Sequence, residues 1–255
     1  MNSSLLKKSL AIAATLAALM NNAQAGAPTS AWPVVYPYNL VGKLTYVFST
    51  GSGALNRGSG FVAKGSSIAT SAYNVYDAQL GWAKSHTFYL GYDNGSYTSR
   101  TTGRYTYALS GYVNAAKSAG TWSNQALSAD AGGIVLWSAP AGGRYLGYTA
   151  SGAGLVRSTT TSKMLLGYGY ENGHTGNSML AASTTRWSAI VYGNLYRSTD
   201  MGAEAGMFGG PALVRSGSTW VVAGIIVGRE FVGSSGALIR ATDGNVALLI
   251  NSYLR

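Results

Sequence analysis

From Lys43 onward the chain is a succession of short β-type runs separated by glycine, serine, asparagine and aspartate. The runs are rich in β-branched, aromatic and leucine residues, and they end at residues typical of turns. Many short strands with regular turn signals are typical of β-sandwiches and β-barrels. The clearest runs are 43–48, 86–92, 105–109, 133–137, 163–166 and 220–227. The sequence therefore predicts an all-β fold.

The end of the chain follows a different period. Apolar side chains recur there at intervals of three and four residues, which is the spacing of one face of an α-helix. They are Val246, Leu249, Ile250, Tyr253 and Leu254. Asp243 precedes them and can cap the first turn with its carboxylate. The sequence predicts a single α-helix at the C-terminus.

Residues 1–25 have the features of a secretory signal peptide. Lys7 and Lys8 come first, an apolar stretch follows, and Ala23-Gln-Ala25 ends the segment with the small residues that signal peptidase accepts. The apolar stretch is shorter than the roughly 20 residues that span a bilayer. We expect cleavage near Ala25–Gly26, a secreted or periplasmic mature chain, and no transmembrane segment in it.

The expected mature chain begins with a proline-containing arm, has no cysteine and carries a positive net charge. Residues 26–40 hold three of the five prolines and are expected to form an extended N-terminal arm. The chain has no cysteine, so disulfides cannot support the fold. Loss of residues 1–25 lowers the formal net charge from +10 to +8, which favours anionic partners such as acidic glycans. No run of five basic residues occurs, and we expect no specific nucleic-acid contact.

Three segments carry motifs that occur in a definite order. The first is Gly58-Ser-Gly-Phe-Val62, followed by Ile68-Ala-Thr-Ser-Ala-Tyr-Asn-Val75. The second is Ser128-Ala-Asp-Ala-Gly-Gly-Ile-Val-Leu-Trp137. The third is Gly206-Met-Phe-Gly-Gly-Pro-Ala-Leu213, followed by Trp220-Val-Val-Ala-Gly-Ile-Ile-Val-Gly228.

In this order the segments resemble the trypsin/chymotrypsin-like serine protease family, and they are most similar to its bacterial glutamyl-endopeptidase-like branch. The corresponding family motifs read GSGFV, TAAHNV, DYGAIKL, GDSGGPLV and VVGIHWG. The resemblance covers about residues 41–255, with a weak match around 80–125. It implies two six-stranded antiparallel β-barrels, the first over 41–140 and the second, with the C-terminal α-helix, over 141–255.

The resemblance also implies that the family's catalytic groups are missing. Tyr73 stands at the histidine position, Asp130 at the aspartate position and Phe208 at the serine position. A phenyl ring cannot attack a carbonyl, and a phenol with a pKa of about 10 is a poor proton acceptor at neutral pH. Loss of the nucleophile or the base costs about a millionfold in rate. We therefore expect no catalysis at these positions.

Two further parts of the family's site can be placed by the resemblance. The oxyanion loop corresponds to Gly206, Met207 and Gly209, whose main-chain N–H groups would remain. The substrate cleft corresponds to Ile225, Ile226, Val227 and Gly228. Isoleucine and valine replace the histidine and tryptophan of the glutamate-specific relatives, so a glutamate preference is not expected. The apolar residues indicate either a filled cleft or simple core packing.

The remaining polar residues suggest structural roles. We expect the Tyr73 hydroxyl to donate a hydrogen bond to Asp130 in place of the lost imidazole, so that Tyr73→Phe destabilises the fold. His86 and His174 are expected to be surface or structural residues. With no cysteine and no spaced carboxylate pair, neither a metal site nor a cofactor is expected. Glu204 and Asp200 are expected to be loop charges rather than a two-carboxylate site.

Three functions remain open from the sequence. The first is a non-catalytic protease homologue that binds a protein partner or acts as a scaffold. The stretch 92–123, rich in Gly, Ser, Thr and Tyr, fits either a contact surface or solvated β-hairpins. The second is an active secreted hydrolase with a relocated site. The third is an electrostatic binder of acidic glycans.

Overall fold

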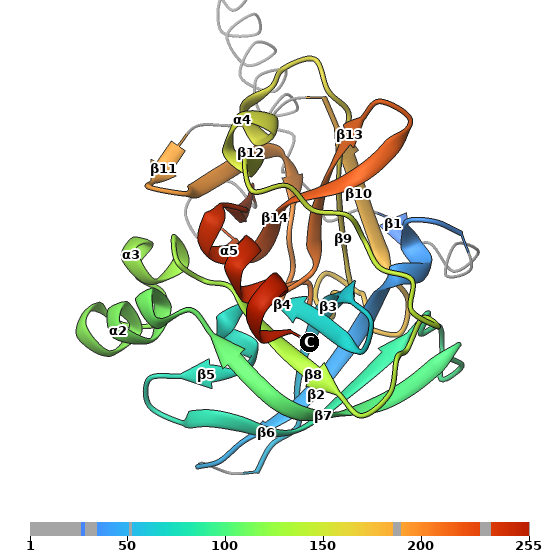
Figure 1. Ribbon diagram of the computed structural model, residues 1–255, viewed down its shortest axis with the longest axis vertical. Coiled ribbons are helices and arrows are strands. Elements are labelled where there is room, and N and C mark those ends of the chain that lie inside the picture. The colour runs from blue at the N-terminus through green and yellow to red at the C-terminus, as the bar shows by residue number, and fades with distance from the viewer. Residues whose placement is uncertain (1–26, 29–34, 51–52, 186–189, 230–235, 255) are drawn as a thin grey trace, which may run out of the picture.

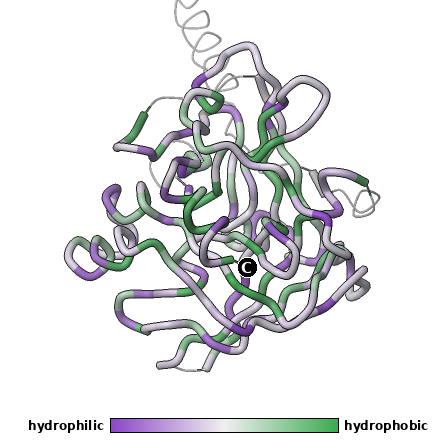
Figure 2. Tube along the Cα trace, in the orientation of Figure 1, coloured by the Kyte–Doolittle hydropathy of each residue, from purple (hydrophilic) through white to green (hydrophobic). Residues whose placement is uncertain are grey.

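The computed structural model describes residues 27–28, 35–50, 53–185, 190–229 and 236–254, arranged as two antiparallel β-sheets with a few short helices (Figure 1). The predicted signal peptide lies outside the described residues. Hydrophobic stretches follow the central strands, whereas hydrophilic stretches lie mostly in the outer loops (Figure 2). This distribution is expected where short strands bury one face each and turns remain in water.

The first sheet closes into a barrel of six strands. Their spatial order is β2 (Val41–Phe48), β3 (Asn56–Lys64), β4 (Ser67–Thr70), β8 (Gly132–Leu136), β7 (Ser99–Ala108) and β6 (Gly81–Leu90). β6 pairs back with β2, and the short β5 (Tyr76–Asp77) pairs with β6. Phe61 and Phe88 are fully buried inside. A Cβ on Gly42 would collide with Cζ of Phe88, so this close approach requires glycine.

The second sheet has eight strands. Their order is β1 (Ala27–Pro28), β10 (Leu180–Thr184), β9 (Lys163–Gly167), β13 (Pro211–Ser216), β14 (Thr219–Arg229), β15 (Gly236–Ala241), β12 (Leu195–Gly202) and β11 (Ile190–Tyr192). The short β1 and β11 flank the six strands of the expected barrel. Within the described residues, no hydrogen-bonded pairing between β10 and β12 closes this sheet. The N-terminal arm adds β1 and a 3₁₀ turn, η1 (Tyr38–Leu40).

The stretch 92–123 contains helical structure that the sequence analysis did not predict. β7 leads into α2 (Ser110–Ala119), and α3 (Asn124–Leu127) follows a short turn. Tyr112, Ala115 and Ala116 are the buried residues of α2, at the i, i+3, i+4 spacing of one helix face. Solvated hairpins are therefore wrong for this part of the stretch. A further short helix, α4 (Gly152–Arg157), lies in the connection between the two sheets.

The predicted C-terminal helix is present and begins at the predicted cap. Asp243 accepts hydrogen bonds from the N–H groups of Asn245 and Val246 at the start of α5 (Gly244–Leu248). The last turn, η3 (Leu249–Tyr253), is a π-helix in which the Leu254 N–H donates to the Leu249 carbonyl. Leu254 is buried, whereas Tyr253 is exposed, contrary to the prediction. The wider π turn advances the apolar face by one residue and rotates Tyr253 into solvent.

Candidate functional site

Tyr73 and Asp130 come together because of the pairing of two strands in the first barrel. Tyr73 lies in the 3₁₀ turn η2 (Ala72–Asn74), just after β4, and Asp130 lies just before β8. β4 and β8 are antiparallel, with Thr70 opposite Gly132. The Tyr73 main-chain N–H consequently donates a hydrogen bond to Asp130 Oδ1 at 3.0 Å.

Asp130 is a fully buried carboxylate with one unused oxygen. Its Oδ2 has no hydrogen-bond partner among the described residues. Burial raises the pKa of Asp130 to about 7, although the main-chain N–H groups of Tyr73 and Ala72 and the charge of Arg240 act in the opposite direction. A fully buried carboxyl with one oxygen that accepts no hydrogen bond favours its neutral form.

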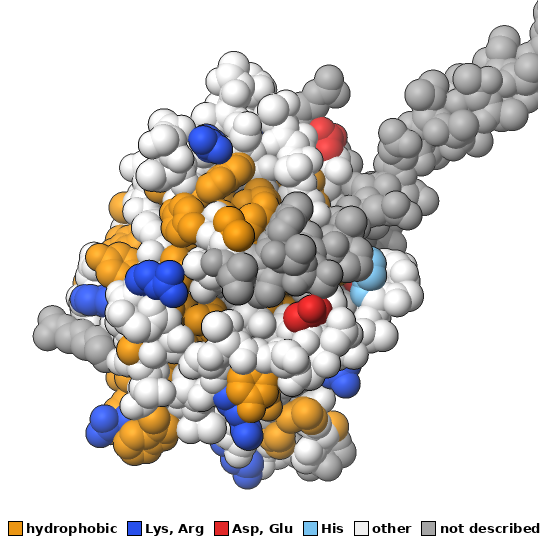
Figure 3. Space-filling model, turned by 90° about the vertical axis from the view of Figure 1, so that its right-hand side faces the viewer, with side chains coloured by type: hydrophobic (Ala, Val, Ile, Leu, Met, Phe, Trp, Pro, Cys, Tyr) orange, Lys and Arg blue, Asp and Glu red, His pale blue; other side chains and the backbone are white. Residues whose placement is uncertain are grey.

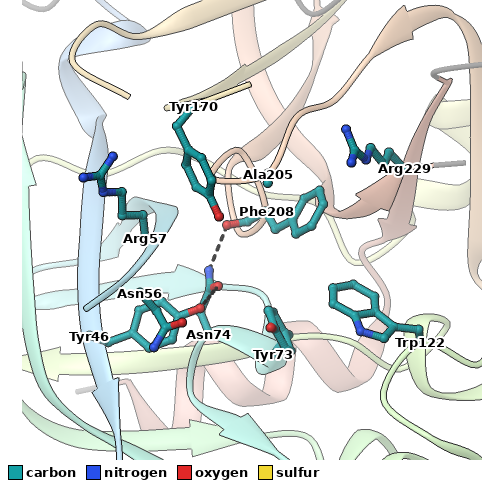
Figure 4. Close-up of a pocket in the computed structure, with 11 residues that line it drawn as sticks. Tyr46, Asn56, Arg57, Tyr73, Asn74, Trp122, Tyr170, Ala205, Phe208 and Arg229 are labelled. Atoms are coloured by element: carbon teal, nitrogen blue, oxygen red, sulfur yellow. Dashed lines mark hydrogen bonds between the residues drawn. The ribbon is translucent and has the colours of Figure 1, made fainter. Parts of the chain in front are cut away.

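The predicted hydrogen bond from the Tyr73 hydroxyl to Asp130 is wrong. Asp130 Oδ1 receives the Tyr73 main-chain N–H, and the Tyr73 hydroxyl has no hydrogen bond with any described residue. The ring packs instead against Trp122, with centroids 4.7 Å apart, and Trp122 in turn lies 6.0 Å from the ring of Phe208. These three residues thus form an aromatic cluster at the junction of the two sheets (Figure 4).

A cavity of about 200 Å³ opens beside this cluster. Its walls come from both sheets and from the loop between α2 and α3 (Figure 4). They consist of Tyr46, Asn56, Arg57, Tyr73, Asn74, Trp122, Tyr170, Ala205, Gly206, Phe208 and Arg229. Among these described lining residues there is no serine, threonine, cysteine, histidine, aspartate or glutamate. Phenols, amides and guanidinium groups are the polar groups that the wall offers.

Asn74, which was not among the site residues predicted from the sequence, joins the main chain at Phe208 to the first barrel. The Asn74 Nδ2 donates to the Phe208 carbonyl at 2.8 Å, and the Ser59 N–H donates to the same carbonyl at 2.9 Å. Asn74 also donates to the Thr70 hydroxyl and accepts from the Tyr46 hydroxyl. The only available signal was its position next to Tyr73 in the TAAHNV-like motif.

The loop expected to form the oxyanion hole keeps the backbone shape that glycine permits. Gly206 and Gly209 have φ angles of 93° and 92°, which are strained for residues with a Cβ. Met207 is fully buried, and the Gly209 N–H donates to the Ile226 carbonyl at 2.7 Å. Within the described part of the chain, the N–H groups of Gly206 and Phe208 donate to no other residue. Two main-chain donors are therefore uncommitted at the cavity.

The predicted cleft residues of β14 lie in the protein interior. Ile225, Ile226 and Val227 are fully buried, and Gly228 is also buried. None of the four lines the cavity, but the next residue, Arg229, does. Both faces of a central strand are buried, so its sequence is apolar on either face. The sequence of such a strand therefore does not show which side chains line a cleft and which pack in the core.

Glu204 lies in the loop between β12 and β13, as expected, but it is not a solvated charge. Its side chain is buried, and it accepts hydrogen bonds from His174 Nδ1 at 2.8 Å, Asn172 Nδ2 at 3.1 Å and the Glu171 N–H at 3.2 Å. Glu171 forms an ion pair with Arg229 and accepts the Ala205 N–H. These contacts hold the loop after β9 against the chain that leads to Phe208. Burial of Glu204 is possible because each oxygen has donors.

The remaining predicted polar residues have structural positions. His86 is buried, with Nε2 3.3 Å from the Asn74 carbonyl, and burial lowers the pKa of its imidazole to about 4. His86 is therefore neutral near pH 7 and does not line the cavity. Asp200 is exposed and accepts from the Thr184 hydroxyl. The described residues contain no cluster of three metal-ligating side chains, and none of their helices is both long and apolar enough to cross a membrane.

Comparisons with known proteins identify the fold. No protein-family model and no curated protein sequence matches the chain. Among solved structures, a Glu endopeptidase has a TM-score of 0.70 at 16% identity, with 90% of this chain and 96% of that chain covered. The protease Anisep from Arthrobacter nicotinovorans has a TM-score of 0.67 at 16% identity, covering 85% and 95%. The thermostable serine protease AL20 has a TM-score of 0.66 at 12% identity, covering 85% and 97%. The predicted trypsin-like double-barrel fold is confirmed.

Proposed function

We propose that this chain is an exported protein that uses the trypsin-like double barrel as a non-catalytic binding or scaffold module. The observation that carries the proposal is the chemistry of the cavity at the junction of the barrels. Its described walls contain no hydroxyl nucleophile of the serine or threonine type, no thiol, no imidazole and no carboxylate. Acyl transfer requires a nucleophile and a base within hydrogen-bond reach of each other.

Neither histidine of the chain supplies the missing base. His86 is buried against the Asn74 carbonyl with a pKa lowered by burial, and His174 is bound to Glu204. Neither side chain lines the cavity. Ser59 is the serine that contacts the oxyanion loop, but its hydroxyl donates to the Gly206 carbonyl and accepts from the Tyr168 N–H while fully buried. A relocated hydrolytic site finds no support among these residues.

The aromatic cluster is the second reason to expect a binding module without catalysis. The rings of Tyr73, Trp122 and Phe208 pack in series beside the cavity, and in this proposal Tyr73 and Phe208 replace the imidazole and the hydroxyl of the catalytic relatives. A binding module needs only a rigid body that presents side chains, and the barrels supply that body. The proposed export is supported by the signal-peptide pattern of residues 1–25.

The test is labelling of the mature protein with a fluorophosphonate probe, together with a casein digest. We expect no labelling and no digestion by the unaltered protein. The double variant Tyr73→His/Phe208→Ser restores the base and the nucleophile next to Asp130, whose Oδ2 is unused. This variant is expected to gain slow labelling, whereas each single variant is not, because the two groups act as a unit.

One outcome would contradict the proposal: labelling of the unaltered protein that disappears on mutation of one serine would identify an active hydrolase. Failure of the folded double variant to label would contradict the assignment of Tyr73 and Phe208 to the positions of the family's base and nucleophile. A trypsin-like enzyme carried through the same labelling serves as the positive control.

A further inference from the structure

A row of aromatic side chains lies on the outer face of the first barrel, along β7 and at the residue that follows β8. The exposed fraction is 66% for Trp137 and 51% for Tyr105. Large aromatic side chains in such exposed positions commonly mark a binding surface when they lie together. Orange hydrophobic patches next to blue basic side chains are visible on the face drawn in Figure 3.

A β-bulge brings a cation into this row. The pairing of β7 with β8 shifts register between Gly103 and Tyr105. Such a bulge lets two consecutive residues face the same side of the sheet. The Arg104 guanidinium consequently lies 4.9 Å from the ring centre of Tyr105 and 4.8 Å from that of Trp137.

The Arg104 guanidinium is held in place without using its hydrogen-bond donors. It forms no hydrogen bond and no ion pair with any described residue. Contact with two rings restricts the side chain, while its N–H groups have no acceptor among the described residues. A restrained arginine with free donors is suited to bind a carboxylate through two parallel hydrogen bonds.

The row continues toward the C-terminus. Tyr107 follows Tyr105 at the strand period of two and is half-buried against the core, and its ring centre lies 5.6 Å from that of the exposed Tyr253 on the last turn. Lys64 contacts the Asn251 carbonyl at 3.4 Å on the same terminal segment. None of the chain's acidic residues lies in 99–108, 132–137 or 244–254. The row therefore combines aromatic side chains with the cation Arg104, and Lys64 lies near its C-terminal end.

We propose that this surface, formed by Arg104, Tyr105, Tyr107, Trp137 and Tyr253, binds an acidic polysaccharide. Sugar rings present faces of C–H groups that pack on flat aromatic rings, and a uronate carboxylate between two stacked sugars would meet Arg104. The net charge of +8 expected for the mature chain attracts such a polymer from a distance. The site shares no residue with the cavity at the barrel junction, so it is independent of the proposed loss of catalysis.

The test is isothermal titration of the mature protein with alginate oligosaccharides, which are chains of uronate sugars, in low salt. A neutral mannan oligosaccharide and poly-glutamate serve as comparison ligands. We expect alginate to bind at least tenfold more tightly than either, because one lacks the carboxylates and the other lacks the sugar faces. Trp137→Ala, Tyr105→Ala and Arg104→Gln are each expected to weaken alginate binding about tenfold.

Two matched variants control for general effects on charge and fold. Arg215→Gln removes an arginine stacked on Trp220 elsewhere, and Tyr145→Ala removes another exposed tyrosine. Both should bind alginate as the unaltered protein does. The proposal fails if alginate does not bind at millimolar concentration, if poly-glutamate binds equally well, or if the ring variants bind alginate normally. Tighter binding of oligo(dT) through the same rings would assign the surface to single-stranded nucleic acid instead.

Discussion

The side-chain amide of Asn74 donates a hydrogen bond to the Phe208 carbonyl at 2.8 Å and so joins the two barrels at the floor of the cavity (Figure 4). The same side chain contacts the hydroxyls of Tyr46 and Thr70. The aromatic cluster above it therefore rests on a polar network in which each Asn74 group has a partner. Such buried networks are costly to break at one member.

Asn74→Ala is expected to lower the free energy of unfolding by about 2–4 kcal/mol, because three buried hydrogen bonds are lost together. Chemical denaturation of the mature protein measures this. Asn56→Ala is the matched control, because Asn56 lines the same cavity but its side chain contacts only the nearby Ala54 carbonyl. This variant should lower the free energy of unfolding much less. Equal losses of unfolding free energy in the two variants would contradict a specific role for Asn74.

Tyr73→Phe is expected to leave the melting temperature nearly unchanged, because the hydroxyl it removes makes no hydrogen bond to Asp130 or to another described residue. Tyr73→Ala should lower it clearly, since the ring packs on Trp122 and Phe48. Thermal unfolding followed by circular dichroism compares the two. A large fall in melting temperature for Tyr73→Phe would instead support the hydrogen bond from the Tyr73 hydroxyl to Asp130 that was predicted from the sequence.

Asp130→Asn is expected to change how stability depends on pH. Because burial raises the pKa of Asp130 from 3.8 to about 7, the folded protein retains a proton that the unfolded chain releases. The stability of the unaltered protein therefore falls as pH rises from about 4 to about 7, by up to about 4 kcal/mol from this group.

Asparagine keeps an acceptor for the Tyr73 N–H and cannot ionise. The variant should be more stable than the unaltered protein at pH 8 and should lose that advantage toward pH 4. Urea denaturation across this range is the measurement, with the exposed Asp200→Asn as control. A variant less stable at pH 8 would show that Asp130 is ionised and satisfied in the folded protein.

Leu254→Ala is expected to destabilise the protein by about 2–3 kcal/mol, the usual cost of truncating a buried leucine. Leu254 is fully buried, and its Cδ1 would lie 2.6 Å from a Cβ placed on Gly133. Leu248→Ala, on the same helical segment but 54% exposed, should change stability little. Similar losses at the two positions would show that the terminal turn does not dock as described.

The all-β fold and the capped terminal helix could be predicted because the spacing of apolar residues along the chain indicates both. The double barrel could be predicted because the family motifs occur in the expected order. Tyr73 and Asp130 were expected to be in contact, and they are, but through the main-chain N–H of Tyr73 rather than its hydroxyl. A sequence does not show which atom of a residue reaches a partner, because this depends on the direction in which the side chain leaves its turn.

Trp122, Asn74 and Arg229 were not predicted to be part of the site. Trp122 belongs to the turn between α2 and α3, in the part of the chain where the motifs match weakly. Its place at the cavity depends on a contact with Tyr73, which is far away in the sequence. Helix α2 itself could have been recognised from Tyr112, Ala115 and Ala116, but the surrounding glycine and serine favoured an irregular stretch.

The docking of Leu254 on Gly133 fastens the helical segment that follows β15 of the second sheet to β8 of the first barrel. Because Leu254 is fully buried there, moving the two sheets apart would expose its side chain to water. This contact therefore favours unfolding of the two sheets as one cooperative unit.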